Sequence, residues 1–136
     1  MVQQERYIKE CLIELNCALE MAQTQVLPCA LNHYKLLLKT QSLAQGLGTT
    51  FGGDAFLNTL GKLISKLFED IQNLQMSVDQ LSENLHHEHL ANLLHAICNT
   101  HLPRLAHLRA VVDELEAILP KDQWPYPTYA DMVFEI

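Results

Sequence analysis

The chain has 136 residues, of which 49% are hydrophobic and 18% charged, and its formal net charge is −7 at pH 7. This length and apolar content predict one folded domain and exclude a disordered chain. The acidic balance and the scattered lysines and arginines argue against nucleic acid or a membrane surface as a partner. We see neither a signal-peptide core nor an apolar run long enough to span a membrane.

The first helix is expected over residues 3–44. Its apolar side chains recur at alternating steps of three and four, which is typical of a seam that packs against other helices. This seam consists of Ile8, Leu12, Leu15, Leu19, Ala22, Val26, Cys29, His33 and Leu36.

The cysteines show no CxxC pair, and three of the four lie on the first helix. Side chains about two turns apart on one straight helix cannot form a disulfide. We therefore expect reduced thiols and a cytoplasmic location, for Cys11, Cys17, Cys29 and Cys98 alike.

A glycine-rich loop, QGLGTTFGGD, separates the first helix from a second one expected over residues 54–84. Asp54 is the predicted N-cap of this helix. The second helix has the most regular seam of the chain: Leu57, Leu60, Ile64, Leu67, Ile71, Leu74, Val78, Leu81 and Leu85.

A turn near residues 84–88 is expected next, because one helix from 54 to 119 would leave its leucines uncovered. Asn84 is the candidate left-handed residue of this turn. The third helix is expected over 88–119, with the seam Leu90, Leu94, Ile97, His101, Leu105, Leu108, Val112, Leu115 and Leu119. The fold prediction is all-α, with residues 1–119 forming three long antiparallel helices in an up-down-up bundle.

Pro28 and Pro103 interrupt the first and third helices. Each removes one helical hydrogen bond, but the apolar spacing continues past both, so they predict kinks rather than ends. Counting along the bundle from its two turns places them at about the same height. The two outer helices are then expected to bend together.

Residues 120–136 are expected to form an extended C-terminal arm. Pro120 closes the third helix, and the WPYP segment restricts the backbone toward extended geometry. An extended segment with large side chains usually lies in a groove. The arm's candidate interaction residues are Trp124, Tyr126, Tyr129, Met132 and Phe134.

Six of the seven histidines fall between residues 86 and 107. The string HHEH lacks the second histidine of a metalloprotease motif, and the spacing of His95, Cys98 and His101 is too generic to assign a metal. His33 and His101 occupy seam positions within about two turns of each other in height. Two interpretations stay open for this pair, namely histidines bonded to carbonyls freed by the kinks or a pH-sensitive contact between helices.

No arrangement of catalytic residues is evident. The chain has no nucleophile elbow and no convergent pair of carboxylates, and its glycine-rich loop lacks the lysine of a P-loop. We assign no catalytic, cofactor-binding or metal-binding residue.

Two segments resemble the C-terminal region of type III glutamine synthetases. The first is residues 5–34, around MAQTQVLP. The second is residues 97–134, which combine a helix-borne Leu-Pro, the run RAVVDELE and the ending WPYPTYADMVF. Together they cover about half of the chain.

The resemblance implies a non-catalytic domain of an ATP-dependent glutamate–ammonia ligase. The family's ATP and its Mg or Mn would be held by a β-barrel catalytic domain that has no counterpart in this sequence. The implied partners are that catalytic domain and neighbouring subunits of a ring-shaped homo-oligomer. The arm would dock there or pack back on its own bundle, and both arrangements stay open. A freestanding helical adaptor and a metal-binding bundle are competing hypotheses for the function of the chain.

Overall fold

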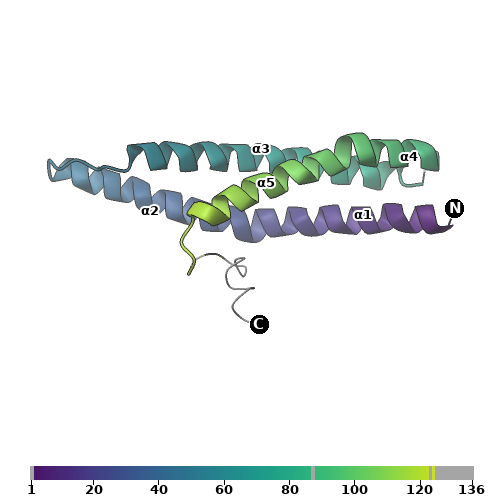
Figure 1. Ribbon diagram of the computed structural model, residues 1–136, viewed down its shortest axis with the longest axis horizontal. Coiled ribbons are helices and arrows are strands. Elements are labelled where there is room, and N and C mark those ends of the chain that lie inside the picture. Colours follow the sequence, from purple (N-terminus) through teal and green to yellow (C-terminus); the bar gives the residue numbers. More distant parts are fainter. Residues whose placement is uncertain (1, 87, 123, 125–136) are drawn as a thin grey trace.

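The computed structural model describes residues 2–86, 88–122 and 124. Three helical rods pack side by side and run alternately in opposite directions (Figure 1). They comprise α1 (Val2–Met21), η1 (Ala22–Val26) and α2 (Leu27–Gly46) in the first rod, α3 (Asp54–Asn84) in the second, and α4 (Leu90–Ala96), η2 (Ile97–His101) and α5 (Leu102–Ile118) in the third. No strand occurs in the described ranges, and the all-α, up-down-up prediction is confirmed.

The middle rod, α3, packs against both of the others. Its predicted seam is buried from Leu57 to Leu81, and its last residue, Leu85, is partly buried. The 3.5-residue repeat keeps one stripe facing the partner helices. The residues concerned are Leu57, Leu60, Ile64, Leu67, Ile71, Leu74, Val78 and Leu81. None of the helices in the described part of the chain is long and apolar enough to cross a membrane.

The loop between α2 and α3 begins with a glycine C-cap. Gly48 has φ +75°, and the N–H of Thr49 donates to Ala44 O at 2.9 Å, while that of Gly48 donates to Gln45 O at 3.1 Å. These two bonds form a Schellman motif, which needs a left-handed residue at this position.

At two helix ends, the structure differs from the sequence prediction. Asp54 is the first residue of α3 rather than its cap, and its carboxylate accepts a hydrogen bond from Gln41 Nε2 at 2.9 Å. A carboxylate in the first turn is also favoured by the helix dipole. Asn84 is not left-handed, since no described residue other than glycine has a positive φ.

Each proline is preceded by one π-helical segment, and the helix continues beyond it. Because the proline ring removes an N–H and crowds the carbonyl four residues back, the helix takes in an extra residue. The wide turn is closed by Leu27 N–H donating to Ala22 O and by Leu102 N–H donating to Ile97 O. In Figure 1 the ribbon changes direction after both segments.

The extra residue shifts the buried seam by one position. The most deeply buried side chains across the two π-helical segments are spaced four and four: Ala22, Val26 and Ala30 in one rod, and Ile97, His101 and Leu105 in the other. Cys29, at the expected step of three, is also buried. Beyond the first segment, Leu37 packs against the core, whereas Leu36, which the predicted seam included, is 52% exposed.

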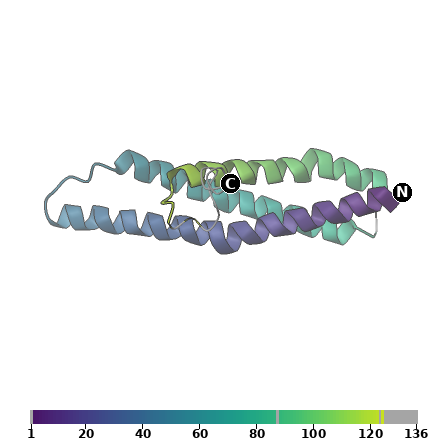
Figure 2. The same cartoon turned by 60° about the horizontal axis from the view of Figure 1, so that its bottom comes forward.

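The prediction that the two prolines share one height is wrong. A groove between the outer rods is lined by both Val26 and Val112, and Val112 lies nine residues beyond Pro103. The prolines are therefore offset along the bundle by roughly two to three turns. The first rod also extends well past the end of the third (Figure 2).

That difference in length leaves one end of the molecule with two rods. The third rod stops at Ile118, and the α2–α3 hairpin continues past it (Figure 2). Leu119 is extended, with φ −83° and ψ 151°, as expected for a residue before a proline. Pro120 then leads the chain into a turn.

Candidate functional site

The only predicted interaction residue of the arm that the structure describes is Trp124. Its side chain is 7% exposed and belongs to the core cluster, and its backbone N–H donates to Pro120 O at 3.1 Å and Lys121 O at 3.3 Å. The start of the arm is therefore a turn against its own bundle, whereas the sequence predicts extension from residue 120. Four predicted interaction residues lie outside the described residues: Tyr126, Tyr129, Met132 and Phe134.

The described residues of the histidine-rich stretch do not converge on a metal site. His95 and Cys98 are exposed, whereas His101 is buried. The amide of Asn99 contacts His95 Nδ1 at 2.7 Å and donates to His95 O at 2.9 Å. Among the described residues, no group of three histidine, cysteine or acidic side chains is arranged to hold a metal ion.

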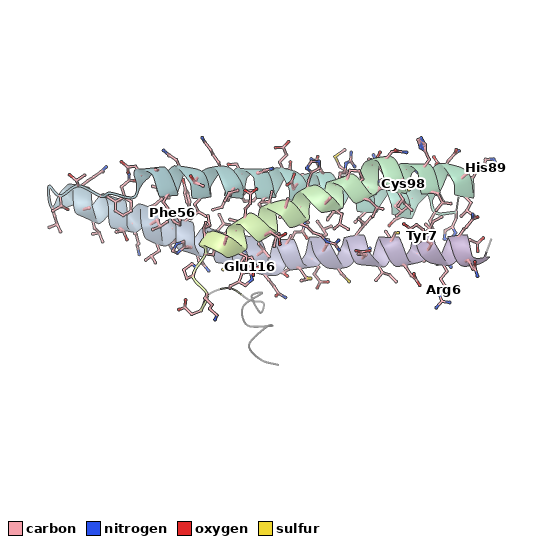
Figure 3. The ribbon with its side chains drawn as sticks, viewed as in Figure 1. Arg6, Tyr7, Phe56, His89, Cys98 and Glu116 are labelled. Atoms are coloured by element: carbon pink, nitrogen blue, oxygen red, sulfur yellow. The ribbon has the colours of Figure 1, made fainter. Side chains whose placement is uncertain are left out.

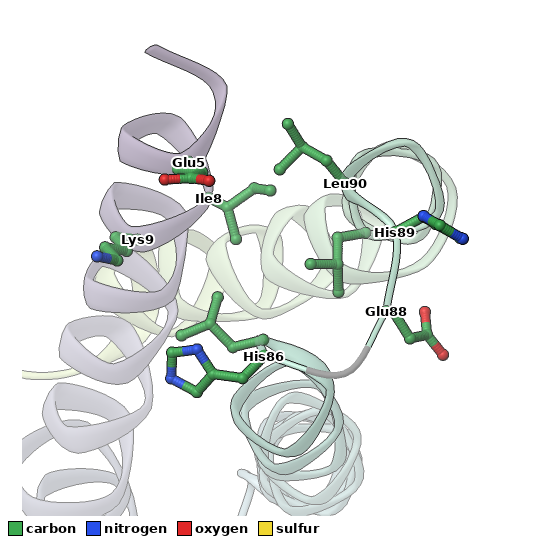
Figure 4. Close-up of a pocket in the computed structure, with 9 residues that line it drawn as sticks. Glu5, Ile8, Lys9, His86, Glu88, His89 and Leu90 are labelled. Carbon is green, nitrogen blue, oxygen red and sulfur yellow. The ribbon is translucent and has the colours of Figure 1, made fainter. Parts of the chain in front are cut away.

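The HHEH string lies beside a hollow of about 340 Å³ between the start of α1 and the turn before α4. Its lining includes Glu5, Lys9 and His86 (Figure 4). The ring of His86 lies on the side facing α1, whereas Glu88 and His89 point away from it. These side chains do not share a ligand position.

His33 and His101 do not form the expected pair. His33 stacks edge-on against Phe56, with ring centroids 6.3 Å apart, and Figure 3 shows Phe56 near the start of α3. His101 instead lies near Arg104, which bonds to Asn73. Phe56 and Asn73 are separated by about 25 Å along α3 at 1.5 Å per residue. The prediction that the two histidines lie within two turns is wrong.

Neither histidine shows the expected bond at Nδ1, since this atom is buried without a partner in both. His101 is 3% exposed. Its burial lowers the pKa of the imidazole, and the charge of Arg104 lowers it further. His101 is thus part of the packed core.

The interface between α3 and the third rod contains polar contacts that the sequence did not predict. Arg104 Nη1 donates to Ser77 Oγ at 2.9 Å and to Asn73 O at 3.4 Å. Ser77 is fully buried, and its small side chain leaves room for the guanidinium. The bond links α5 to α3, and we expect it to help fix the register of the two helices.

Two turns of α3 before Ser77, Asp70 is 8% exposed, and its Oδ2 has no hydrogen-bond partner. Burial raises the pKa of this carboxyl above its ordinary value of 3.8, while Lys66 and His107 act in the opposite direction. Glu69 is a further neighbour and raises the pKa. A buried carboxyl of this kind weakens the fold when it is ionised.

The burial of Asp70 and Ser77 was not predicted from the sequence. Each precedes a seam residue of α3, at a position where a polar side chain is normally exposed to solvent. The sequence feature that could have indicated their burial is their spacing of seven residues, which places them on the same side of α3. A helix packed between two others buries a wider stripe than one seam, so small or polar residues at that spacing can lie inside.

A groove of about 420 Å³ lies between α1–η1 and α5, and most of its surface is apolar. Ala18, Met21 and Val112 line it. At its edge, Arg109 Nη2 pairs with Glu14 Oε1 at 2.6 Å. Both side chains are about half exposed or more, so this ion pair contributes little to stability.

Five of the exposed large apolar side chains lie on α2 or at its C-cap. Its leucines are between 38% and 81% exposed: Leu31, Leu36, Leu38, Leu43 and Leu47. Exposed apolar surface of this extent is typical of a contact with another segment or protein. We therefore take the side of α2 that carries Leu36, Leu43 and Leu47, called the α2 face below, as a candidate interaction surface.

Comparison with known proteins gives one informative similarity. The chain is 31% identical over 102 residues to a glutamine synthetase from Butyrivibrio fibrisolvens. The chain resembles part of a glutamine synthetase. The aligned region is 75% of this chain and 13% of the relative, so the similarity is distant and partial.

Two further comparisons found nothing. No family model matches the chain, and no solved structure matches it. The similarity is therefore to a small part of one ligase.

Proposed function

We propose that this chain is a non-catalytic structural domain of an ATP-dependent glutamate–ammonia ligase, the C-terminal helical domain of a type III glutamine synthetase. The observation that carries the proposal is the similarity of three-quarters of the chain to part of one glutamine synthetase. Its role is to support assembly or to position the catalytic part. Its partners are that catalytic part and neighbouring subunits of a ring-shaped oligomer.

The side chains of the bundle support a non-catalytic role. Ligase chemistry on glutamate needs bound ATP and a divalent cation, which is held by converging carboxylates. The acidic residues on the described helices do not converge, and Asp70 is buried alone. In this proposal ATP and Mg or Mn bind elsewhere in the enzyme, and the bundle has a structural role in assembly or in positioning the catalytic part.

The test uses the Butyrivibrio enzyme. We expect that removing its matching region lowers both its assembly, measured by light scattering, and its glutamine formation. A chimaera carrying the aligned region of this chain should restore assembly. The same chimaera with Leu67→Arg, which disrupts the core of the bundle, is the matched control and should not.

Two outcomes would contradict the proposal. One is a truncated enzyme that assembles and works as well as the intact one. The other is glutamine formation by the purified 136-residue chain alone.

A further inference from the structure

Three of the exposed leucines of α2 lie on one side of the helix and form the α2 face. Leu36, Leu43 and Leu47 are spaced by seven and four, so they lie on the same side of the helix. All three are at least half exposed, so the described part of the third rod does not cover them. The side that meets α3 is a different one. It carries Leu37, which packs against the core, and Tyr34, whose hydroxyl lies over Gly61.

The same stretch is the basic part of an acidic protein. Residues 21–53 contain no aspartate or glutamate, and their lysines are Lys35 and Lys39, on α2 itself. The chain as a whole has a net charge of −7. An occupant of this face should therefore be acidic as well as apolar.

Residues 125–136, PYPTYADMVFEI, have that composition. They contain Asp131 and Glu135 and no lysine or arginine. Their large apolar side chains are Tyr126, Tyr129, Met132, Val133, Phe134 and Ile136. The negative charge of residues 125–136 thus complements the lysines of the α2 face, and their apolar side chains complement its leucines.

The length of this segment also suffices. It follows Trp124, whose side chain is buried in the core, and twelve extended residues reach about 40 Å. The leucines from Leu36 to Leu47 span about 16 Å of helix. A tethered segment meets its own bundle at an effective concentration in the millimolar range, which favours it over a second copy.

We propose that residues 125–136 dock along the leucine face of α2 in the same chain, with Asp131 and Glu135 next to Lys35 and Lys39. The docked segment covers apolar surface that would otherwise promote association. This inference goes beyond the proposed function and does not depend on it, since it concerns the isolated chain.

The test is disulfide trapping in the full chain. The exposed Cys17 and Cys98 are replaced by serine, and Leu43→Cys is combined with Met132→Cys. After mild oxidation with diamide, we expect an intramolecular disulfide, seen by mass spectrometry of the monomer. Met132→Cys with Glu20→Cys, at an exposed acidic position, is the matched control and should react at least about fivefold more slowly.

Exchanging the charges tests the proposed contact of Asp131 and Glu135 with Lys35 and Lys39. Lys35→Glu with Lys39→Glu should slow trapping by about three- to tenfold, and adding Asp131→Lys with Glu135→Lys should restore it. Circular dichroism of each variant confirms that the helices remain. A disulfide-linked dimer would mean that a second copy occupies the face, and equal trapping in both cysteine pairs would mean that the segment does not dock there. Either outcome overturns the proposal.

Discussion

The three-rod section and the two-rod end of this molecule are both rich in leucine, but leucines that are buried in the first are exposed in the second. Beside the third rod, Leu67 and Leu74 of α3 are 0% exposed. At the other end, Leu43 and Leu47 of α2 are 69% and 81% exposed. Leucine content therefore does not decide burial here. The length of the third rod does, because two helices can bury only the stripes that face each other.

The largest expected effect comes from truncating one leucine in each section. Leu74→Ala should lower the free energy of unfolding by about 3 kcal/mol, because it removes a fully buried side chain and leaves a cavity. Leu43→Ala should cost less than about 1 kcal/mol even with residues 125–136 docked over it, because one tethered segment buries this side chain only in part. Urea unfolding followed by circular dichroism measures both. Equal losses would show that the two ends are packed alike.

The next prediction concerns the polar contact between α5 and α3 in the three-rod section. Arg104→Met keeps the apolar stem but leaves Ser77 Oγ buried without its donor, and should cost about 1–2 kcal/mol. Ser77→Ala in the same background should recover part of that loss. A double-mutant cycle in urea should give a coupling of about 1 kcal/mol. A coupling near zero would mean that the bond does not fix the register.

The sequence is sufficient for the architecture and insufficient for its irregularities. The seam from Leu57 to Leu81 is recognisable because one period runs unbroken through it. The four-and-four spacing around His101 is also visible, but spacing alone does not distinguish a kink from an added residue. In the first rod, Cys29 fits the expected spacing, so the sequence contains no sign that the seam shifts by one residue. This shift places Ala30 and Leu37 against the core.

The candidate site is less predictable for a physical reason. Burial of Asp70 and Ser77 depends on how far α5 extends along α3 and on which turns face each other. Those are long-range properties that a local pattern does not contain. The α2 leucines are equally misleading, since Leu36 has the spacing of a core residue and lies where no third rod covers it.

A third prediction uses Asp70. Its folded-state pKa is raised by burial, so the folded chain binds a proton more tightly than the unfolded chain. Stability should then fall as the pH rises from the ordinary value of 3.8 through the raised one. Asp70→Asn should remove that fall and add about 1 kcal/mol at pH 7. Asp79→Asn, at an exposed site on the same helix, is the control and should leave stability unchanged.

The smallest expected effect is the pH dependence due to His101. Burial and Arg104 lower its pKa, so the unfolded chain binds the proton more readily. Stability is then complete above the ordinary pKa of 6.5 and declines as the pH falls through it. His101→Leu should shrink the difference in unfolding free energy between pH 7.5 and pH 5.5 by up to about 1 kcal/mol. Leu105→Val, which weakens the same core without a titrating group, should lower stability equally at both pH values. An unchanged difference in His101→Leu would show that the imidazole is hydrated, and hence that the third rod seals this section less completely than its leucines indicate.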